Sequence, residues 1–339
     1  MTTSWTQDRL LELLRGFQPA CLVAAAADLD LFSHLNQAPK RVSVLAQAIK
    51  ADPRGLRILL DALTALNLIK KQETGYSITK PVKSLLSHQS DTSILPGIQH
   101  LSNCLRSWSQ LPHTIKTGQP YDRPPSIRGS HGDTESFIQA MQIFTRDQVP
   151  QTVARLQNLQ IKHLLDIGGA SGNWTTAFLT ANPRAKATLF DLPQVIPLAQ
   201  KHLTECHMID RVQLVSGDYN IDALPTTIDL AWLSAITHQN SRSQNRALFA
   251  RIFSSLEPHG TLIIRDIVMA SNRTFPVAGA LFAVNMLACT EAGNTFTLEE
   301  YSEDLRAAGF CHIELVFKDE GMNSLIQAKR LTSRFHTLS

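Results

Sequence analysis

From residue 161 onward, short apolar runs alternate with segments whose apolar residues recur at helical spacing. The predicted strands are 162–167, 187–191, 212–216, 228–233 and 261–268, with helices such as 175–179 and 245–256 between them. Nearly continuous apolar strands that alternate with helices are typical of a mostly parallel sheet covered on both faces. Two later runs, 312–317 and 323–330, predict a closing antiparallel hairpin. The pattern therefore predicts an α/β fold for this half of the chain.

The first 35 residues have a helical pattern. The pattern begins near residue 8, with leucines that recur from Leu10 onward and lead into an alanine-rich stretch at 20–27. Pro19 interrupts the pattern, so we expect two helices here rather than one. An alanine-rich segment with almost no charge needs a partner surface, which is either the core or another subunit. We expect an oligomer surface.

Residues 42–80 follow the order helix, helix, hairpin, which is typical of a winged helix. The predicted helices are 42–49 and 53–66, and two short strands within 68–79 are joined by a turn near Gly75. Such a module either binds DNA through its second helix or serves in dimerisation and as a lid over the substrate. Only Arg54 and Arg57 are basic in that helix, so we expect the second role.

The segment between these regions has a weaker pattern. Several prolines and a Gly-Ser-His-Gly stretch predict an irregular connection over 81–130, and 135–159 is expected to be a helical bridge. We therefore predict three parts. They are a helical winged-helix domain over 1–100, a bridge and substrate-lid region over 101–160, and an α/β domain over 161–339.

Composition narrows the class of protein. With 43% hydrophobic and 18% charged residues the chain can bury a large core, and a net charge of +3 without a basic run argues against a nucleic-acid partner. Five cysteines without a CxxC pair favour a reducing compartment over a disulfide framework or a zinc site. The N-terminus lacks the order of a secretory signal, and no apolar run approaches the roughly 20 residues that span a bilayer. We expect a cytoplasmic protein without membrane contact.

The strongest motif, Leu-Leu-Asp-Ile-Gly-Gly-Ala-Ser-Gly-Asn-Trp, ends the first predicted strand of the α/β half. Gly168, Gly169 and Gly172 allow a tight turn and a close approach to a ligand beyond the carboxyl ends of the strands. A dinucleotide loop would need glycine in place of Ile167, and a Walker loop would need Gly-Lys-Ser or Gly-Lys-Thr. Asp166 adds negative charge at the loop, which suits a cationic ligand better than a phosphate.

Two more acidic residues follow the next two predicted strands. Asp191 ends the second strand, where a carboxylate can accept hydrogen bonds from both hydroxyls of a ribose. Asp218 follows the third strand and is expected to accept from an adenine amino group, with Tyr219 packing on the ring. One such aspartate is often only a helix N-cap. Three in succession beside the glycines predict a nucleoside site.

Three segments that carry these residues resemble the successive cofactor motifs of one known family. Asp-Ile-Gly-Gly-Ala-Ser-Gly, Phe-Asp-Leu-Pro-Gln-Val and Ser-Gly-Asp-Tyr are similar to those of the caffeate-type small-molecule O-methyltransferases, which have a bacterial natural-product branch. The N-terminal helices and the winged-helix module resemble the dimerisation domain of that family. The resemblance therefore covers nearly the whole chain.

The resemblance implies a class I methyltransferase fold, a Rossmann-like sheet that is mostly parallel with a C-terminal antiparallel hairpin. It implies S-adenosyl-L-methionine as cofactor, S-adenosyl-L-homocysteine as its product, and no metal. It also implies an intertwined homodimer in which the N-terminal domain of one subunit helps to close the active site of the other. Leu192, Gly217 and Ser234 join the expected cofactor site, and Ser234 stands where the family has a lysine near the adenine.

Methyl transfer from a sulfonium needs an oriented acceptor and a group that removes its proton. By the resemblance, His238 after the fourth strand is the catalytic base, and Asp266 after the fifth strand holds it and fixes its tautomer. The alternatives are a structural histidine and an ordinary aspartate at a strand end. The chain departs from the family at Gln239 and Asn240, which replace Asp-Trp, and at Thr295, which replaces a second acid.

The acceptor pocket and the acceptor itself are the least determined by the sequence. The resemblance suggests Met141, Gln142, Phe144, Asn285, Met286 and Thr290, for which plain core packing is the alternative. We expect a methyltransferase acting on a hydroxyl of an aromatic or polyketide-like metabolite. A carbon or nitrogen acceptor, or a relative that binds the cofactor without methylating, stays open. A winged-helix regulator that senses the cofactor is the hypothesis from another class.

Overall fold

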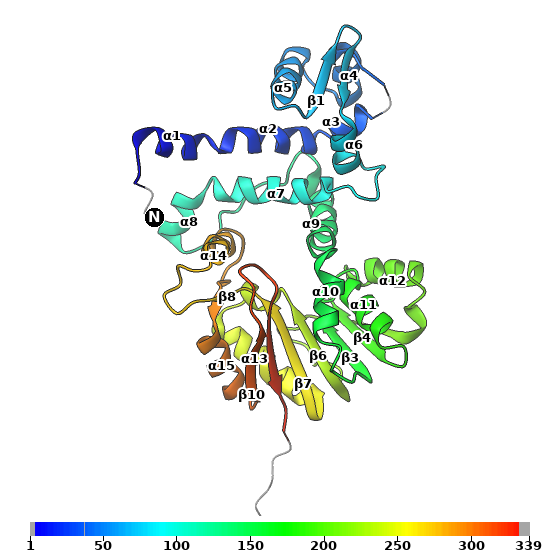
Figure 1. Cartoon of the computed structure of the whole chain (residues 1–339), viewed down its shortest axis with the longest axis vertical. Helices are drawn as coiled ribbons and strands as arrows, with labels where there is room; N and C mark the ends of the chain where they lie inside the picture. Colours follow the sequence, from blue (N-terminus) through cyan, green and yellow to red (C-terminus); the bar gives the residue numbers. More distant parts are fainter. Residues whose placement is uncertain (1–3, 37, 332–339) are drawn as a thin grey trace, which may run out of the picture. The chain divides into compact units, whose positions relative to one another are not determined.

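A computed structural model describes residues 4–36 and 38–331, and the chain folds as two compact units (Figure 1). The first unit runs to Ser109 and includes Asp122–Phe144, and the second consists of Gln110–Tyr121 and the chain from Thr145 onward. The three-part division at residues 100 and 160 stays a prediction. Each unit is described separately below.

The first unit begins with two helices, as predicted. Helix α1 spans Gln7–Arg15 and α2 spans Phe17–Asp28, but the break falls at Gly16 and not at Pro19. Pro19 lies in the first turn of α2, where its missing N–H would have had no partner in the helix.

The expectation that the alanine-rich stretch forms an oligomer surface is wrong in part. Ala24, Ala26 and Ala27 are buried within the unit, and the last two belong to its hydrophobic core. No residue of α1 is buried, and its Leu13 and Leu14 remain 66% and 64% exposed. The exposed apolar surface therefore lies upstream of the alanines.

The expectation that no apolar run has membrane-spanning length is also wrong. Helices α1 and α2 together, Gln7–Asp28, give 22 residues that contain an 18-residue window with a mean hydropathy of 1.3, which is long and apolar enough to cross a bilayer. Core helices of soluble proteins and signal sequences meet the same criterion, so length and composition do not place this helix in a membrane.

The winged-helix order is confirmed. After the short α3 (Leu31–His34) come α4 (Val42–Ile49), α5 (Pro53–Ala65), β1 (Ile69–Gln72) and β2 (Gly75–Ile78). Strands β1 and β2 are antiparallel. Asp52 caps α5 by accepting the Gly55 N–H at 2.8 Å, and Pro53 occupies the first helical position that suits it.

The region predicted to be irregular, 81–130, is largely helical. It contains α6 (Lys80–Leu86), α7 (Leu95–Trp108), α8 (Leu111–Thr117) and the start of α9 (Gly129–Thr145). Much of the buried face of α7 is polar, so the sequence lacks the recurring apolar residues that would predict a helix. Gln99 donates to the Ala27 carbonyl at 3.0 Å and Ser102 donates to the Asp28 carboxylate at 2.7 Å.

The predicted bridge at 135–159 is two helices. Helix α9 ends at Thr145, and α10 (Gln148–Arg155) lies in the second unit, where it packs on α11 (Asn173–Ala181). Helix α9 starts earlier than predicted because Arg128, just before it, pairs with Asp28 at 3.0 Å and with Asp133 at 3.1 Å.

The second unit is built on a seven-stranded sheet, which confirms the α/β prediction. Its strands are β3 (His163–Ile167), β4 (Lys186–Asp191), β5 (Val212–Ser216), β6 (Ile228–Ser234), β7 (Leu256–Asp266), β10 (Cys311–Phe317) and β11 (Ser324–Lys329). The order across the sheet is β10-β11-β7-β6-β3-β4-β5. Strands β3 to β7 pair in parallel, and β11 joins β7 and β10 antiparallel. The closing hairpin is therefore confirmed.

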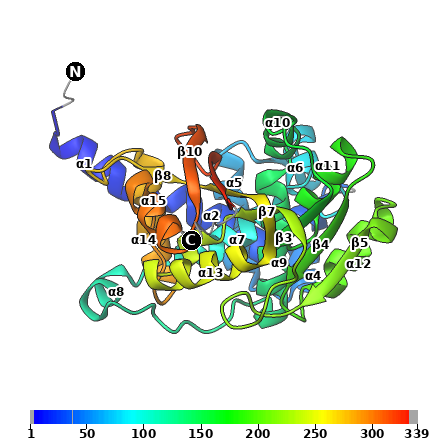
Figure 2. The same ribbon diagram turned by 90° about the horizontal axis from the view of Figure 1, so that it is seen from below.

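Helices cover both faces of this sheet (Figures 1 and 2). Helices α10 and α11 pack on alternate strand residues such as Leu164 and Ile263. Helix α12 (Ile196–Glu205) packs on Leu189, which continues that face. Helices α13 (Arg242–Ser255) and α15 (Leu298–Ala307) pack on the intervening residues, such as Leu165 and Ile264. Burial on both faces is why the central strands β3 and β6 are mostly apolar.

The remaining elements lie around the carboxyl ends of the parallel strands or between strands. They are the 3₁₀ turns η1 (Ile209–Arg211) and η2 (Thr237–Gln239), helix α14 (Val277–Cys289), and the short parallel pair β8 (Val268–Met269) and β9 (Phe296–Thr297). The chain leaves β3 toward β4 and β5 and returns on the other side to β6 and β7. In open sheets the ligand crevice lies at such a switch point, here beyond the tips of β3 and β6.

Candidate active site

A glycine turn follows β3 at this switch point. Gly168 has φ +67° and Gly172 has φ +83°, conformations that favour glycine. A Cβ on Gly168 would lie 2.6 Å from Cδ1 of Ile236, and one on Gly169 would lie 2.7 Å from Cγ of Leu189. The turn therefore has no room for side chains at these positions, and its backbone is free to approach a ligand closely.

Asp191, at the tip of β4, holds the turn in place. Its Oδ2 accepts the Ala170 N–H at 2.8 Å and its Oδ1 accepts the Leu192 N–H at 2.7 Å. Burial raises the pKa of this carboxyl, and the two N–H groups oppose that rise. Each oxygen keeps one more lone pair, so the carboxylate can still accept hydrogen bonds from a ligand. The side chain of Leu192 beside it is 37% exposed.

The tip of β5 adjoins this carboxylate. The Gly217 N–H donates to the Asp191 carbonyl at 2.9 Å, and a Cβ on Gly217 would lie 2.5 Å from Cζ of Phe190. Asp218 accepts the Asn220 N–H at 2.8 Å. The Tyr219 ring lies beside the glycine turn, with Cε1 3.9 Å from the position of a Gly168 Cβ. Burial and then the charges of Asp218 and Asp191 raise the pKa of Tyr219 to about 12, so the phenol keeps its proton.

Asp166 lies inside the unit, beneath the turn. It is 1% exposed and its Oδ2 accepts the Thr175 hydroxyl at 2.6 Å. Burial raises the pKa of this carboxyl from 3.8 to about 7, with the charge of Asp191 adding to the rise and Thr175 opposing it. Its predicted contact with a cationic ligand stays a prediction.

The raised pKa of Asp166 makes the stability of the protein depend on pH. An acid with a higher pKa in the folded state stabilises that state at low pH, and the contribution is lost as the pH rises toward about 7. We expect the free energy of unfolding to lose about 3 kcal/mol from this group between about pH 5 and about pH 8. Urea unfolding of the wild type and of Asp166→Asn measures the difference. Curves for the two proteins that run parallel over this range would contradict the assignment.

His238 lies on η2, just beyond the tip of β6, and is 6% exposed. Its Nδ1 is 2.9 Å from Oδ1 and 3.0 Å from Oδ2 of Asp266, the last residue of β7. The structure thus brings together the two residues that the sequence predicted as a pair. Their catalytic roles stay predictions.

Several donors surround the Asp266 carboxylate. Oδ1 also accepts the Ile267 N–H at 2.8 Å, and Oδ2 accepts the Thr237 hydroxyl at 2.5 Å. Burial alone would raise the pKa of Asp266, but its interaction with His238 and these hydrogen bonds hold the pKa below its usual value. Asp266 is therefore an ionised acceptor. A neutral imidazole facing it carries its proton on Nδ1 and its lone pair on Nε2.

The turn that carries His238 is fixed from two sides. The Asn294 N–H donates to the His238 carbonyl at 2.9 Å, and the Phe282 ring of α14 meets the imidazole edge to face, with centroids 4.8 Å apart. Asn245 donates to the Thr237 carbonyl at 2.9 Å and accepts from Asn240 at 3.1 Å. Asn240, one of the two residues that replace Asp-Trp, therefore forms a buried amide link with Asn245, which was not predicted from the sequence.

Ser234, predicted in the cofactor site, accepts a hydrogen bond from Arg265 at 3.1 Å. Arg265 is 2% exposed, donates to Asn323 at 3.1 and 2.6 Å, and stacks 5.0 Å from the centroid of Trp174. Burial lowers the pKa of its guanidinium to about 10, so it stays charged. The guanidinium of Arg265, on β7, therefore places a positive charge at the tip of β6, although position 234 itself is not a lysine.

The predicted acceptor residues fall in both units. Met286 is buried on α14, Asn285 beside it is half-buried, and Thr290 ends that helix by donating to the Met286 carbonyl at 2.7 Å. Met141, Gln142 and Phe144 lie on α9, in the first unit, and their part in the site stays a prediction. Thr295 is buried, and its hydroxyl donates to the Gly279 carbonyl at 3.4 Å.

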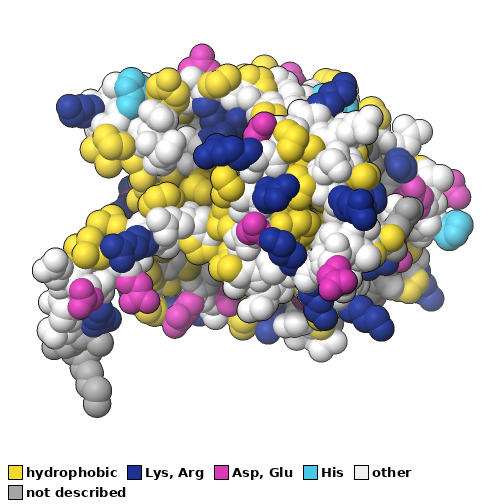
Figure 3. All heavy atoms as spheres, turned by 90° about the horizontal axis from the view of Figure 1, so that it is seen from above, with side chains coloured by type: hydrophobic (Ala, Val, Ile, Leu, Met, Phe, Trp, Pro, Cys, Tyr) yellow, Lys and Arg dark blue, Asp and Glu magenta, His cyan; other side chains and the backbone are white. Residues whose placement is uncertain are grey.

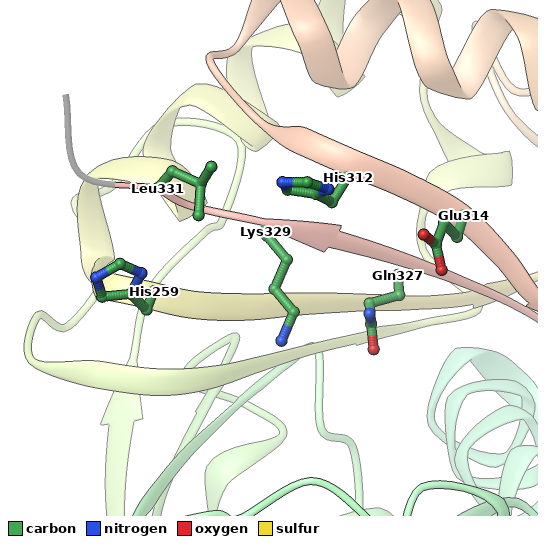
Figure 4. A pocket seen from close by; sticks show the side chains of 6 residues that line it. All are labelled: His259, His312, Glu314, Gln327, Lys329 and Leu331. Atoms are coloured by element: carbon green, nitrogen blue, oxygen red, sulfur yellow. The ribbon is translucent and has the colours of Figure 1, made fainter. Parts of the chain in front are cut away.

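A cavity of about 400 Å³ lies at the opposite end of the strands from the glycine turn (Figure 4). Its lining includes His259, near the start of β7, and His312, near the start of β10. No predicted site residue lines it. Within residues 4–36 and 38–331, no group of three or more His, Cys, Asp or Glu side chains is arranged to hold a metal ion.

With this geometry described, two family models match the chain. The O-methyltransferase domain matches residues 126–311, and the O-methyltransferase dimerisation domain matches residues 11–88. The first match alone covers more than half of the chain. The chain belongs to the O-methyltransferase family. Membership makes it a SAM-dependent methyltransferase and favours the enzyme over the cofactor-sensing regulator.

Individual relatives agree with this membership. The O-methyltransferase chain is 28% identical to the tetracenomycin polyketide synthesis 8-O-methyl transferase TcmO of Streptomyces glaucescens, over 90% of this chain and 91% of that one. It is 26% identical to the 3-hydroxy-5-methyl-1-naphthoate 3-O-methyltransferase of Streptomyces sahachiroi, over 94% and 93%. Among solved structures, human N-acetylserotonin methyltransferase in complex with SAM matches with a TM-score of 0.80 and 25% identity, over 98% of this chain and 100% of that one. The predicted class I fold and family are confirmed.

Proposed function

We propose that this O-methyltransferase moves a methyl group to a hydroxyl of an aromatic or polyketide-like metabolite, with His238 as general base. The observation that carries the proposal is the buried pair of His238 and Asp266, 2.9 Å apart, at the strand edge that also bears the glycine turn. Two relatives support the substrate class, because TcmO is named for 8-O-methyl transfer in tetracenomycin polyketide synthesis and the other enzyme for 3-O-methylation of a naphthoate.

The residues at this edge fit S-adenosyl-L-methionine. The glycine turn carries no side chain at positions 168 and 169, where a Cβ would clash with Ile236 and Leu189, and the carboxylates of Asp191 and Asp218 stand at neighbouring strand tips as acceptors for ribose and adenine. We assign the cofactor to the turn, these two carboxylates, and the predicted Asp166, Gly172, Leu192, Gly217, Tyr219 and Ser234. When bound, the cofactor supplies an electrophilic methyl group on a sulfonium.

The chain itself provides the proton transfer. His238 Nε2 takes the proton of the acceptor hydroxyl as the oxygen becomes nucleophilic, and the ionised Asp266 stabilises the imidazolium that results. A buried carboxylate does this without reorganising water, because its other hydrogen bonds are already in place. No residue of the chain needs to form a covalent intermediate.

We also propose that the enzyme works as a homodimer through its N-terminal unit and resides in the cytoplasm. The dimerisation-domain match and the exposed apolar side chains of α1 and of Phe17 support the dimer. None of the five cysteines forms a disulfide in the described chain, which supports a reducing compartment. On the face drawn in Figure 3, lysine and arginine side chains lie among hydrophobic and acidic ones, so we propose a small molecule, and not a nucleic acid, as the other partner.

Transfer of labelled methyl from S-adenosyl-L-methionine to a panel of phenols, naphthols and hydroxyquinones tests the function. We expect products whose new methyl carbon shows the NMR shift of an aryl ether. Labelled methyl on nitrogen or carbon would show that the acceptor atom is not a hydroxyl oxygen. The absence of label from every aromatic acceptor would refute the substrate class.

A further inference from the structure

The pair of His238 and Asp266 belongs to a longer chain of hydrogen bonds. Asp266 Oδ2 accepts the Thr237 hydroxyl at 2.5 Å, and Thr237 Oγ1 lies 2.6 Å from the hydroxyl of Tyr301 on α15. Asp266, Thr237 and Tyr301 are 1%, 0% and 2% exposed. The chain therefore runs through the interior from Tyr301 to the imidazole, closed to water.

The direction of each proton in this chain follows from the donors available. A threonine hydroxyl has one proton and an ionised carboxylate only accepts, so Thr237 donates to Asp266. Tyr301 must then donate to Thr237. Burial, together with the charge of Asp266, raises the pKa of Tyr301 well above its usual value, so the phenol keeps that proton. The Thr237 proton is thereby directed at Asp266.

We propose that Thr237 and Tyr301 are positioning residues for methyl transfer, which fix Asp266 as an acceptor so that His238 presents Nε2 to the acceptor hydroxyl. The proposal rests on the proposed role of His238 as base. Without the Thr237 hydroxyl, a carboxylate surrounded by the apolar core loses one of its donors and no longer holds the imidazole in one tautomer. Without the Tyr301 hydroxyl, the Thr237 proton is free to rotate away.

Two nearly isosteric variants separate the effect of the Thr237 hydroxyl from the effect of side-chain packing. Thr237→Val keeps the volume and removes the hydroxyl, whereas Thr237→Ser keeps the hydroxyl and removes a methyl group. We expect Thr237→Val to lower kcat about 10-fold, and Thr237→Ser to stay within about 2-fold of the wild type. Calorimetric affinity for S-adenosyl-L-homocysteine should be unchanged in both, which also shows that both fold.

A double-mutant cycle tests the part of Tyr301. Tyr301→Phe should lower kcat about 3-fold in the wild type and not at all in Thr237→Val, because the phenol acts only through that hydroxyl. Tyr76→Phe, which removes a phenol bonded to Asp61 in the first unit, is the control and should leave kcat unchanged. An equal loss of kcat from Tyr301→Phe in both backgrounds would refute the proposal that Tyr301 acts through Thr237. A Thr237→Ser variant as impaired as Thr237→Val would refute the role of the Thr237 hydroxyl.

Nitrogen NMR shifts of the His238 ring provide a readout independent of turnover. We expect a single tautomer with the proton on Nδ1 in the wild type and in Thr237→Ser, and a mixture in Thr237→Val, with the signals assigned by their loss in His238→Gln. If His238→Ala keeps full activity, the base assignment fails while these shifts still test the positioning. An unchanged single tautomer in Thr237→Val would refute it.

Discussion

Replacing His238 with alanine is expected to lower kcat about 10²–10⁴-fold, the usual contribution of a positioned general base. The imidazole is the base candidate because its Nδ1 is engaged by the ionised Asp266, which leaves the lone pair on Nε2. Affinity for S-adenosyl-L-homocysteine should change little, since neither His238 nor its partner Asp266 is among the residues assigned to the cofactor. Steady-state kinetics with the best phenol of the panel, beside a calorimetric titration, separates the two effects.

A matched histidine variant is the control for a general effect of replacing a histidine on the fold. His202 on α12 is half-buried like many structural histidines, and its Nε2 lies 3.7 Å from the sulfur of Cys206. His202→Ala should leave kcat unchanged. If His238→Ala turns over at the wild-type rate, the enzyme accelerates transfer by orienting its acceptor and not by removing a proton.

Replacing Asp191 with alanine is expected to weaken binding of S-adenosyl-L-homocysteine by at least about 100-fold. The variant loses acceptors for the ribose. It also loses the two hydrogen bonds from the N–H groups of Ala170 and Leu192 that hold the glycine turn in place. Charged hydrogen bonds of this kind contribute about 1.5–3 kcal/mol each. Calorimetry gives the affinity, and urea unfolding shows how much of the loss follows from a weakened fold.

The control for this variant is another aspartate on the same unit. Asp210 is exposed on η1, away from the strand tips, and Asp210→Ala should bind with unchanged affinity. An Asp191→Ala protein that binds the product as tightly as the wild type would remove the carboxylate from the cofactor site.

Much of the second unit was predictable because short sequence segments determine its strands and turns. A parallel strand buried on both faces is a short apolar run, and the run from Ile228 to Ser234 is one that no helix pattern matches. The glycine turn and the aspartates at the strand tips are likewise short-range features, since each follows directly from the end of its strand. The strand order then places them at one edge.

The features that were missed depend on contacts between distant segments. Helix α7 escaped prediction because its buried positions, such as Gln99, are polar and are satisfied by α2. Tyr301 meets Thr237 across 64 residues, and Arg265 meets Ser234 across 31, without any local pattern at either end. Sequence alone indicates that a strand ends in a functional residue, but not which distant side chain orients it.

The most direct test of the whole account is a calorimetric titration of the purified wild type with S-adenosyl-L-homocysteine. The glycine turn and the strand-tip carboxylates predict saturable binding with one ligand per chain. A protein that releases no heat, and whose thermal unfolding the ligand does not shift, would contradict the cofactor site on which every catalytic assignment depends.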